Sequence, residues 1–344
     1  MNNSLPNNHK FNQLELGIQL LNKATGFMFH AALRAAVKLK LAETLEAHPK
    51  TAEQIAQEIG AIPTVIQQIL RILATQNIFT STYDECFRLT PEAEFLLESH
   101  PYSLRNAVLM FTDQTFWMPS YYLSDMAKGV PIFEKLFGGT FYEYWEKNVD
   151  LPENFHAGMA SYSRLENPFI VDKYPFPENS LIADIAGGRG GLLLEVLKSN
   201  PLTHGILFDR LIITDKHLLH QLGDDSRWET QTGSFFDSTP AADFYLLKAI
   251  THDWDNEKLI NIFNVIRRSM KKTSKLLLID THVINDNKPN FGKNIGLICS
   301  NLMIGADGRT KEELENLLAQ ADLKINRIIK TDCHLSITEV QPNT

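Results

Sequence analysis

Two side chains with the chemistry of a proton-transfer pair, His252 and Asp280, each follow an apolar run that is typical of a buried strand. His252 comes after the run 242–247, and Asp280 comes directly after the run 275–279. Ligands of open α/β sheets bind beyond the carboxyl ends of the strands, so we expect both side chains to project into one crevice. A neutral imidazole, with a pKa of about 6.5, can accept the proton of a phenol, and a carboxylate can orient that imidazole. Taken alone, His252 fits equally well as a cap for the helix expected from about Asp255.

A glycine-rich turn between a strand and a helix predicts a nucleoside-binding unit. Residues 181–185 form a short apolar run, Gly187 and Gly188 follow in the turn, and residues 192–198 then show helical periodicity. A second apolar run ends on Asp209, and an acid about 20 residues beyond such a turn is the usual partner of a ribose diol. The segment is therefore expected to be a βαβ unit with an acid at the tip of its second strand.

The spacing of the glycines distinguishes between two kinds of nucleoside. In the dinucleotide fingerprint Gly-x-Gly-x-x-Gly, Gly188 and Gly190 would supply the first two glycines, but the third position is Leu193. The stretch that begins at Asp184 instead resembles the Asp-x-x-Gly-Gly-x-Gly signature of S-adenosylmethionine-dependent methyltransferases, which need not neutralise a pyrophosphate. A glycine turn that only packs a helix against a sheet remains the alternative.

The bulk composition excludes several classes of protein. The chain has 344 residues and a net charge of -8, which argues against nucleic acid or an anionic membrane as a partner, because phosphates are bound by clustered Lys and Arg. Cys86, Cys299 and Cys333 are too few for a disulfide framework and their spacing suits no zinc site, so we expect no metal. The N-terminus lacks signal-peptide features, and no run approaches the roughly 18 apolar residues that span a bilayer. We therefore expect a cytoplasmic protein.

Residues 1–100 show the pattern of a winged helix. Two amphipathic helices within residues 12–48 precede a capping box at Thr51, a helix that starts at Pro63, a small hairpin, and a further helix capped by Thr90. This layout raises the hypothesis of a DNA-binding regulator. However, the region holds eight Lys or Arg against ten Asp or Glu, whereas a recognition helix needs basic side chains. A packing or dimerisation module fits these charges better.

Residues 101–165 are expected to form a helical segment around a substrate pocket. Eleven aromatic residues occur in the 35 positions 111–145, and such density can line a pocket for a flat aromatic ligand. Packing within a helical core is the simpler explanation for most of these positions. The side chains that we expect to reach a substrate are Met110, Phe116, Trp117, Asn154, Phe155, Met159, Asp253 and Met303.

From residue 166 onward strands alternate with helices, which predicts a Rossmann-like, doubly wound α/β sheet of parallel strands. The change of pattern indicates a domain boundary near residue 165. The expected strands are 181–185, 206–208, 244–247 and 276–279, the helices lie near 191–199, 213–222 and 256–270, and a hairpin of 327–331 and 335–339 closes the sheet.

A family resemblance rests on motifs that occur in a fixed order. They are Gly233-Ser234-Phe235-Phe236, Asp243-Phe244-Tyr245-Leu246-Leu247-Lys248, His252-Asp253-Trp254, and Gly305 followed by Arg309-Thr310. In these motifs the chain resembles the plant caffeate type and bacterial polyketide O-methyltransferases. The similarity covers nearly the whole chain, including the N-terminal winged-helix dimerisation domain.

The resemblance implies a role for each matching residue. His252 matches the catalytic base of the family, and Asp280 falls where the family has a glutamate that orients this base. Asp184 precedes the cofactor turn, and Ser163 matches a serine that approaches the cofactor. The remaining cofactor-binding matches are Gly187 and Gly188 at the methionine side, Asp209 at the ribose, Ser234 and Phe235 in the adenine-side loop, Lys248, and Trp254 near the adenine.

The chain also departs from the family pattern. Because Asp280 is one methylene shorter than glutamate, we expect it to contact His252 over a longer distance or through water. Gly308 stands where the family has a second glutamate, which leaves the base one orienting carboxylate. Ser234 replaces the commoner aspartate, and Ala186 alters the glycine turn.

These observations together predict a homodimeric, metal-independent O-methyltransferase that uses S-adenosylmethionine to methylate a phenolic hydroxyl of a small aromatic, polyketide-like metabolite. Its parts would be a dimerisation domain (1–100), a pocket segment (101–165) and a cofactor-binding domain (166–344). Two alternatives remain at this point. One keeps the fold and cofactor but catalyses decarboxylation or a pericyclic rearrangement, and the other is the DNA-binding regulator.

Overall fold

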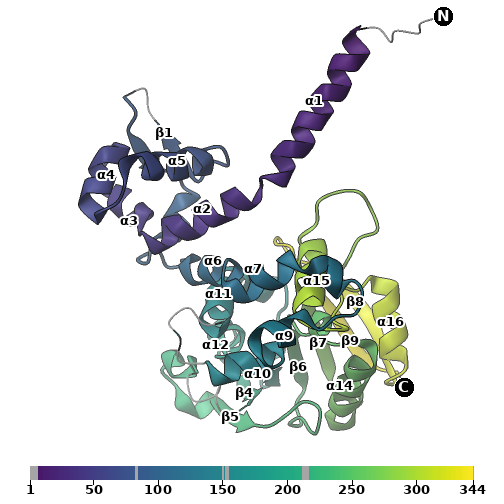
Figure 1. Cartoon of the computed structure of the whole chain (residues 1–344). Coiled ribbons are helices and arrows are strands. Elements are labelled where there is room, and N and C mark those ends of the chain that lie inside the picture. Colours follow the sequence, from purple (N-terminus) through teal and green to yellow (C-terminus); the bar gives the residue numbers. More distant parts are fainter. Residues whose placement is uncertain (1–6, 82–83, 149–150, 152–154, 211–216, 344) are drawn as a thin grey trace, which may run out of the picture. The chain divides into compact units, whose positions relative to one another are not determined.

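The computed structural model describes residues 7–81, 84–148, 151, 155–210 and 217–343, with side chains from residue 12 onward. The chain forms two compact units, Met1–Thr112 and Asp113–Thr344 (Figure 1). The division falls inside the segment 101–165 that we expected to surround the substrate. The assignment of separate roles to 1–100, 101–165 and 166–344 stays a prediction.

The first unit is mainly helical and carries one small hairpin. The capping box predicted at Thr51 is present, because its hydroxyl accepts from the Gln54 amide while the Gln54 side chain accepts from the Thr51 amide. Thr90 accepts from the Ala93 amide, but it caps a single 3₁₀ turn rather than the predicted helix. The elements are α1 (Asn7–Ala24), α2 (Phe27–Lys38), α3 (Leu41–Leu45), α4 (Ala52–Ile59), α5 (Pro63–Ala74), β1 (Phe79–Ser81), β2 (Phe87–Leu89), η1 (Ala93–Leu96) and α6 (Arg105–Phe111).

Helix α1 differs from the other helices of this unit. Helices α2 to α5 bury an apolar face in one core that includes Ala36, Leu41, Ile55 and Leu70, as the helical periodicity predicts. The aliphatic side chains of α1, in contrast, are each more than half exposed. No side chain of α1 from residue 12 onward, where side chains are described, therefore belongs to the core of this unit.

The second unit contains a seven-stranded sheet in the order β5-β4-β3-β6-β7-β9-β8 (Figure 1). The five strands β3 to β7 run parallel to one another, whereas β9 pairs antiparallel with both β7 and β8. The predicted α/β fold is thus confirmed, and the sheet is mixed. Edge strand β5 was missed because its sequence, Trp-Glu-Thr-Gln-Thr, has no apolar run. The strands are β3 (Leu181–Ile185), β4 (His204–Asp209), β5 (Trp228–Thr232), β6 (Phe244–Lys248), β7 (Lys275–Asp280), β8 (Leu323–Lys330) and β9 (Ser336–Pro342).

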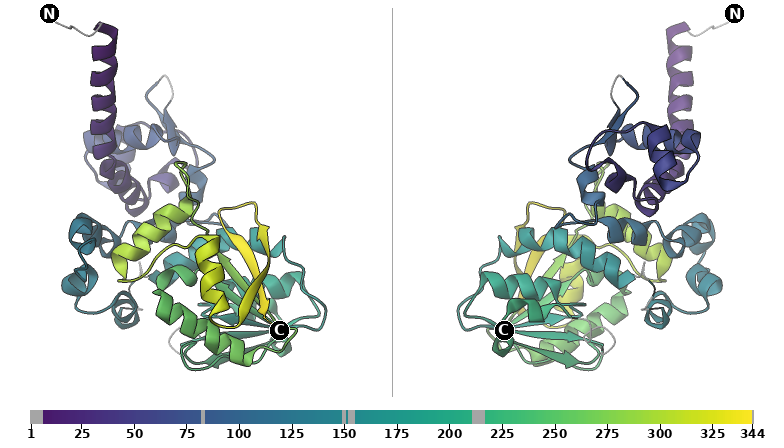
Figure 2. Two further views of the ribbon diagram at one scale, coloured as in Figure 1. Left: turned by 90° about the vertical axis from the view of Figure 1, so that its right-hand side faces the viewer. Right: turned by 90° about the vertical axis from the view of Figure 1, so that its left-hand side faces the viewer.

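Helices cover both faces of this sheet, as the two views of Figure 2 show. Helices α14 and α16 pack on one face, and α11 and α12 pack on the other, each with its own apolar core. The helices are α7 (Gln114–Tyr121), α8 (Leu123–Met126), α9 (Ile132–Phe137), α10 (Phe141–Lys147), α11 (Phe155–Val171), α12 (Gly191–Ser199), α14 (Asn256–Ser269), α15 (Phe291–Leu302) and α16 (Lys311–Ala319), with 3₁₀ turns η2 (Leu219–Leu222), η3 (Asp225–Arg227) and η4 (Thr251–Asp253).

The helix predicted at 213–222 lies partly outside the described residues, and its described end is the 3₁₀ turn η2. Within the described part of the chain, no helix combines the length and hydropathy needed to cross a bilayer.

Candidate active site

The pairing of strands β6 and β7 brings the predicted proton-transfer pair together. The parallel register sets Lys248 opposite Ile279, so the turn after β6 lies beside Asp280 at the end of β7. His252 Nδ1 is 2.8 Å from Asp280 Oδ1. The expectation of a longer or water-mediated contact was therefore wrong. The shorter side chain suffices because the Thr251 hydroxyl, at 2.6 Å, and the Thr281 amide, at 2.8 Å, hold the carboxylate toward the turn.

The acids around His252 determine its charge. Burial alone would lower the pKa of the imidazole, but Asp280, Cys299 and Asp253 outweigh it and raise the pKa of His252 well above its usual value. Burial alone would raise the pKa of Asp280, yet His252 and the hydrogen bonds to the carboxylate lower it. The site thus stabilises an imidazolium, which is the form that His252 reaches after it accepts a proton.

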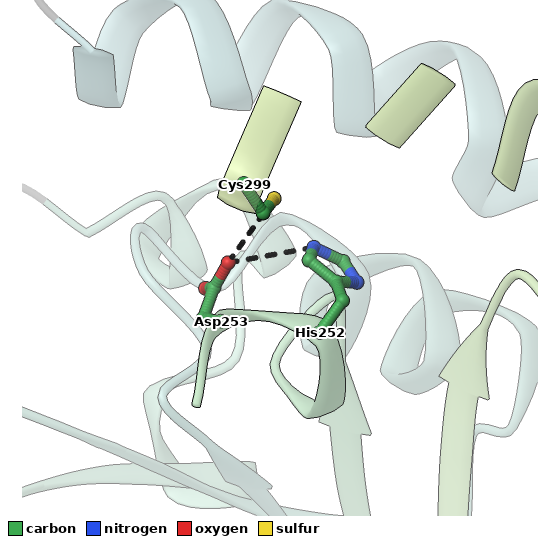
Figure 3. A group of neighbouring side chains, drawn as sticks. All are labelled: His252, Asp253 and Cys299. Carbon is green, nitrogen blue, oxygen red and sulfur yellow. Dashed lines mark hydrogen bonds and ion pairs between the residues drawn. The ribbon is translucent and has the colours of Figure 1, made fainter. Parts of the chain in front are cut away.

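Asp253 lies on the other side of the histidine ring, together with Cys299 of α15 (Figure 3). The distances are 3.6 Å from His252 Nε2 to Asp253 Oδ1 and 3.7 Å from that oxygen to Cys299 Sγ. The phenol of Tyr142 on α10 donates a hydrogen bond to Asp253 Oδ2. Burial raises the pKa of Asp253. The sequence motif indicated Asp253 but not its two contacts from distant helices.

Arg309 anchors the turn that carries His252. Its buried guanidinium donates to the carbonyl oxygens of Thr251 and Trp254, the latter at 2.6 Å, and to Asn256 Oδ1 at 2.9 Å. The neighbouring Gly308 has no room for a side chain, since a Cβ there would lie 2.7 Å from Val283. The sequence motif contained Arg309, but only the structure shows that it positions the loop on both sides of His252.

The glycine turn after β3 forms as the sequence predicts. The Gly188 amide donates to Asp209 Oδ2 at 2.9 Å, and Gly188 has a left-handed φ of 58°. A Cβ on Gly187 would lie 2.5 Å from the carboxylate of Asp184, so the turn requires glycine there. Burial is the main reason that the pKa of Asp184 rises to about 7, and its Oδ2 has no hydrogen-bond partner among the described residues. Ala186 adopts a positive φ of 56°, a conformation that favours glycine.

Lys248 at the end of β6 is held by two residues of α11. Its ammonium donates to Ser163 Oγ at 2.6 Å and to Glu166 Oε2 at 2.5 Å, and both Lys248 and Glu166 are almost fully buried. Burial would raise the pKa of Glu166, but Lys248 and His334 lower it. Sequence analysis found Ser163 and Lys248 and missed Glu166, because an acid in a helix is usually exposed.

The predicted adenine-side residues lie together near the turn η4. The rings of Phe235 and Trp254 are 5.9 Å apart, and Phe236 approaches Trp254 to 4.9 Å. Ser234 Oγ accepts from the Phe236 amide at 3.2 Å, so it orders the loop. The Trp254 Nε1 atom is buried, and no hydrogen-bond partner for it occurs in the described ranges.

The residues predicted to reach a substrate are distributed over several elements. Phe155, Met159 and Ser163 follow at intervals of four on α11, which places them on one face of that helix. Phe116 on α7 and Phe155 both pack against Phe141, at 5.8 and 5.1 Å. Of the other predicted residues, Trp117 lies on α7, Met303 follows α15, Met110 is buried on α6 of the first unit, and Asn154 lies outside the described residues.

Four of the eleven aromatic residues in the segment 111–145 are buried in the helical core. Phe116, Phe133, Phe141 and Trp145 are buried and make edge contacts with neighbouring rings, whereas Tyr121 is 82% exposed. Only part of this segment can therefore face a ligand.

These features define a class of protein. The second unit combines a Rossmann-like sheet with a glycine turn whose amide contacts an acid at the next strand end, an arrangement that suits a nucleoside-containing cofactor such as that of the methyltransferases. A His–Asp pair lies at the ends of two neighbouring strands of this sheet.

The chain belongs to the S-adenosylmethionine-dependent O-methyltransferases of the plant and bacterial type. The O-methyltransferase domain of this family matches residues 121–324, and the O-methyltransferase dimerisation domain matches residues 21–99. The family resemblance of the sequence motifs is thereby confirmed, and the chain is an enzyme rather than a DNA-binding regulator.

Several characterised relatives match along nearly their whole length. The chain is 31% identical over 338 residues to the phenazine O-methyltransferase PhzM of Lysobacter antibioticus, covering 97% of this chain and 99% of the relative. The structure of CalO1, a methyltransferase in calicheamicin biosynthesis solved in an SAH-bound form, matches with a TM-score of 0.88 and 30% identity, over 96% of this chain and 98% of that one. NcsB1, an O-methyltransferase from neocarzinostatin biosynthesis in complex with S-adenosylmethionine and 2-hydroxy-5-methyl naphthoic acid, matches with a TM-score of 0.73 and 25% identity, over 91% and 95%.

The buried Lys248–Glu166 pair gives a stability prediction. Glu166→Gln leaves Lys248 without its balancing charge, so we expect the free energy of unfolding to fall by about 3–5 kcal/mol. Glu195→Gln is the matched control, because it breaks the exposed Glu195–Lys198 pair, 3.0 Å apart, and should cost no more than about 1 kcal/mol. Urea denaturation followed by tryptophan fluorescence measures both losses, and equal losses would contradict the structural importance of the buried pair.

Proposed function

We propose that this enzyme transfers the methyl group of S-adenosylmethionine to a phenolic hydroxyl of an aromatic secondary metabolite, with His252 as general base and Asp280 as the residue that orients it. The observation that carries the proposal is the 2.8 Å contact between His252 Nδ1 and Asp280 Oδ1. Because an ionised carboxylate can only accept, this contact supports a proton on Nδ1, and in the neutral ring Nε2 is then the basic atom.

The described residues fit the cofactor at three places. The unpartnered Asp184 Oδ2 and the glycine turn suit its methionine part, Asp209 suits the ribose diol, and Phe235 with Trp254 suits the adenine. Gly187, Gly188, Ser163, Lys248 and Ser234 complete the proposed set. When bound, the cofactor would supply an electrophilic methyl group on a positively charged sulfur.

The chain's own residues have two tasks in the reaction. They hold the phenol in line with the methyl group, which in well-oriented systems corresponds to effective molarities of about 10⁵–10⁸ M. His252 Nε2 accepts the phenol proton as the oxygen–carbon bond forms and the carbon–sulfur bond breaks, and the resulting imidazolium is stabilised by Asp280. The proton then passes to solvent.

The class of substrate follows from the relatives and from the aromatic cluster. The relatives include a phenazine O-methyltransferase and a mitomycin biosynthesis 6-O-methyltransferase, and the structure of NcsB1 contains 2-hydroxy-5-methyl naphthoic acid. In this chain Phe116, Trp117, Phe155, Met159 and Met303 are the proposed walls for such a flat ring system, and Asp253 is proposed to contact it as well.

We propose a homodimer on two observations. The first unit matches a dimerisation domain, and α1 exposes a set of aliphatic side chains that a partner could cover. These are Leu14, Leu16, Ile18, Leu20 and Leu21.

The base assignment predicts the effect of removing the imidazole. His252→Ala should lower kcat by about 10²–10⁴-fold, because the phenol must then lose its proton to water, while the affinity for S-adenosylhomocysteine stays within about twofold. The assay is mass spectrometry for methylated product on a panel of hydroxylated phenazines and hydroxynaphthoic acids, with calorimetry for the cofactor product. Unchanged turnover in this variant would exclude His252 as the base.

The raised pKa of His252 predicts the pH dependence of methyl transfer. Only the neutral ring accepts a proton, so kcat should rise with pH through a pKa above the usual value of about 6.5. Asp280→Asn removes a negative charge that favours the imidazolium, so the acidic limb should move to lower pH while the maximal rate falls. A pH–rate profile of both proteins checks this, and a limb that stays in place or moves to higher pH would show that Asp280 does not set the pKa.

The dimer can be tested by light scattering. The native chain should show twice its mass of 39.0 kDa. Ile18→Asp combined with Leu21→Asp places charges on the apolar surface of α1, so we expect the dissociation constant to rise by at least about tenfold, or 1.4 kcal/mol. Gln13→Asp combined with Gln19→Asp adds the same charges at polar positions and should leave the mass unchanged. A native monomer would overturn the homodimer.

A further inference from the structure

Three side chains with atoms that can bind zinc, an imidazole, a carboxylate and a thiol, come together at His252. His252, Asp253 and Cys299 each offer one ligand atom, and these three atoms all lie within 4.8 Å of one another (Figure 3). His252 and Asp253 come from the turn η4, and Cys299 comes from α15. Cys299 is 7% exposed, so the group is sheltered from bulk water.

Two of the three ligand–ligand distances match the edges of a metal-ligand tetrahedron, and the third, between His252 and Cys299, is no more than 4.8 Å. Zinc binds nitrogen and oxygen at about 2.0–2.2 Å and sulfur at about 2.3 Å, so tetrahedral angles give N–O and S–O edges of about 3.4 and 3.6 Å. The corresponding distances here are 3.6 Å from His252 Nε2 to Asp253 Oδ1 and 3.7 Å from that oxygen to Cys299 Sγ. Two edges are therefore in place without any movement of the side chains.

The outer contacts of these side chains also fit a metal site. Asp280 holds His252 by Nδ1, which turns Nε2 toward the group, and carboxylates commonly hold zinc-binding histidines in this way. Tyr142 donates to Asp253 Oδ2, which leaves Oδ1 on the side of His252 and Cys299. Thus two of the three ligands are already oriented by a hydrogen bond on their far side.

We propose that His252, Asp253 and Cys299 form a binding site for a soft divalent cation, Zn²⁺ in particular, and that the bound ion inhibits methyl transfer because it occupies His252 Nε2. The inhibition rests on the proposed function, since it requires His252 to be the base, whereas the binding does not. The thiol and imidazole select against Mg²⁺ and Ca²⁺, which prefer oxygen ligands. Three protein ligands leave the fourth position of the ion for water.

Binding of Zn²⁺ releases protons from its protein ligands. The Cys299 thiol gives its proton to solvent as the sulfur–zinc bond forms, and His252 loses the proton on Nε2 if the ring is charged. No electron is transferred, so no oxidant or reductant is needed.

Metal binding is tested on the full-length protein after dialysis against a chelator. Zn²⁺ is titrated in competition with a chromophoric chelator, and Co²⁺ is added separately to detect the near-ultraviolet absorption of a cobalt–thiolate bond. We expect one ion per chain and a cobalt–thiolate band. Cys299→Ser should weaken Zn²⁺ binding by more than about 100-fold, because replacing even a residue that only hydrogen-bonds to a metal ligand lowers metal affinity by about 10–100-fold. Cys333→Ser, the matched control in the same unit, should leave the affinity unchanged.

Inhibition is tested separately by methyl transfer on the phenol panel. Activity of the native enzyme should fall with the same midpoint as Zn²⁺ binding and return on addition of chelator. A melting temperature of Cys299→Ser within a few degrees of that of the native chain shows that the variant is folded. Absence of stoichiometric binding, binding that is unchanged in Cys299→Ser, or activation by Zn²⁺ would overturn the proposal. If no phenol is methylated, the proposed function fails, but the binding and cobalt measurements still decide the metal site.

Discussion

The contact between His252 and Asp280 is the constraint on which the active site depends. It exists because the parallel register of β6 and β7 sets two strand ends side by side and because Arg309 holds the carbonyl groups of the turn between them. A shift of β7 by one residue would turn Asp280, the last residue of this strand, to the opposite face of the sheet. Since both side chains are nearly buried, the carboxylate affects the proton affinity of the imidazole far more than it would in water.

The same surroundings that suit a general base also suit a metal ion. Asp280 and Asp253 flank the ring of His252 and stabilise the imidazolium that methyl transfer would produce. A dication gains from the same two charges, and the nearby thiol of Cys299 adds a soft ligand. The susceptibility to zinc that we propose is thus a consequence of how the base is stabilised, rather than a separate feature of the fold.

Helix α11 carries residues of both the proposed substrate wall and the proposed cofactor site. Phe155 at its start belongs to the aromatic cluster, and Ser163 two turns later contacts Lys248, so about 12 Å of helix separates the proposed substrate wall from the proposed cofactor site. Glu166, one turn further, neutralises Lys248. One rigid element can therefore set the distance between a methyl donor and its acceptor, which is the quantity on which an in-line transfer depends most.

The sequence by itself determined the features that depend on local pattern. Strands β3, β4, β6 and β7, the turn at Gly187 and the strand-end residues His252 and Asp280 were predicted, because apolar runs and glycines report directly on neighbouring backbone. Only the tertiary structure revealed edge strand β5, the burial of Glu166, the direct reach of Asp280, and the approach of Cys299 to Asp253, which lies 46 residues away. The spacing of the cysteines predicted no zinc site, because spacing describes ligands that are close in sequence. The group beside His252 is assembled instead by the packing of α15 against η4, and no local pattern encodes such a contact.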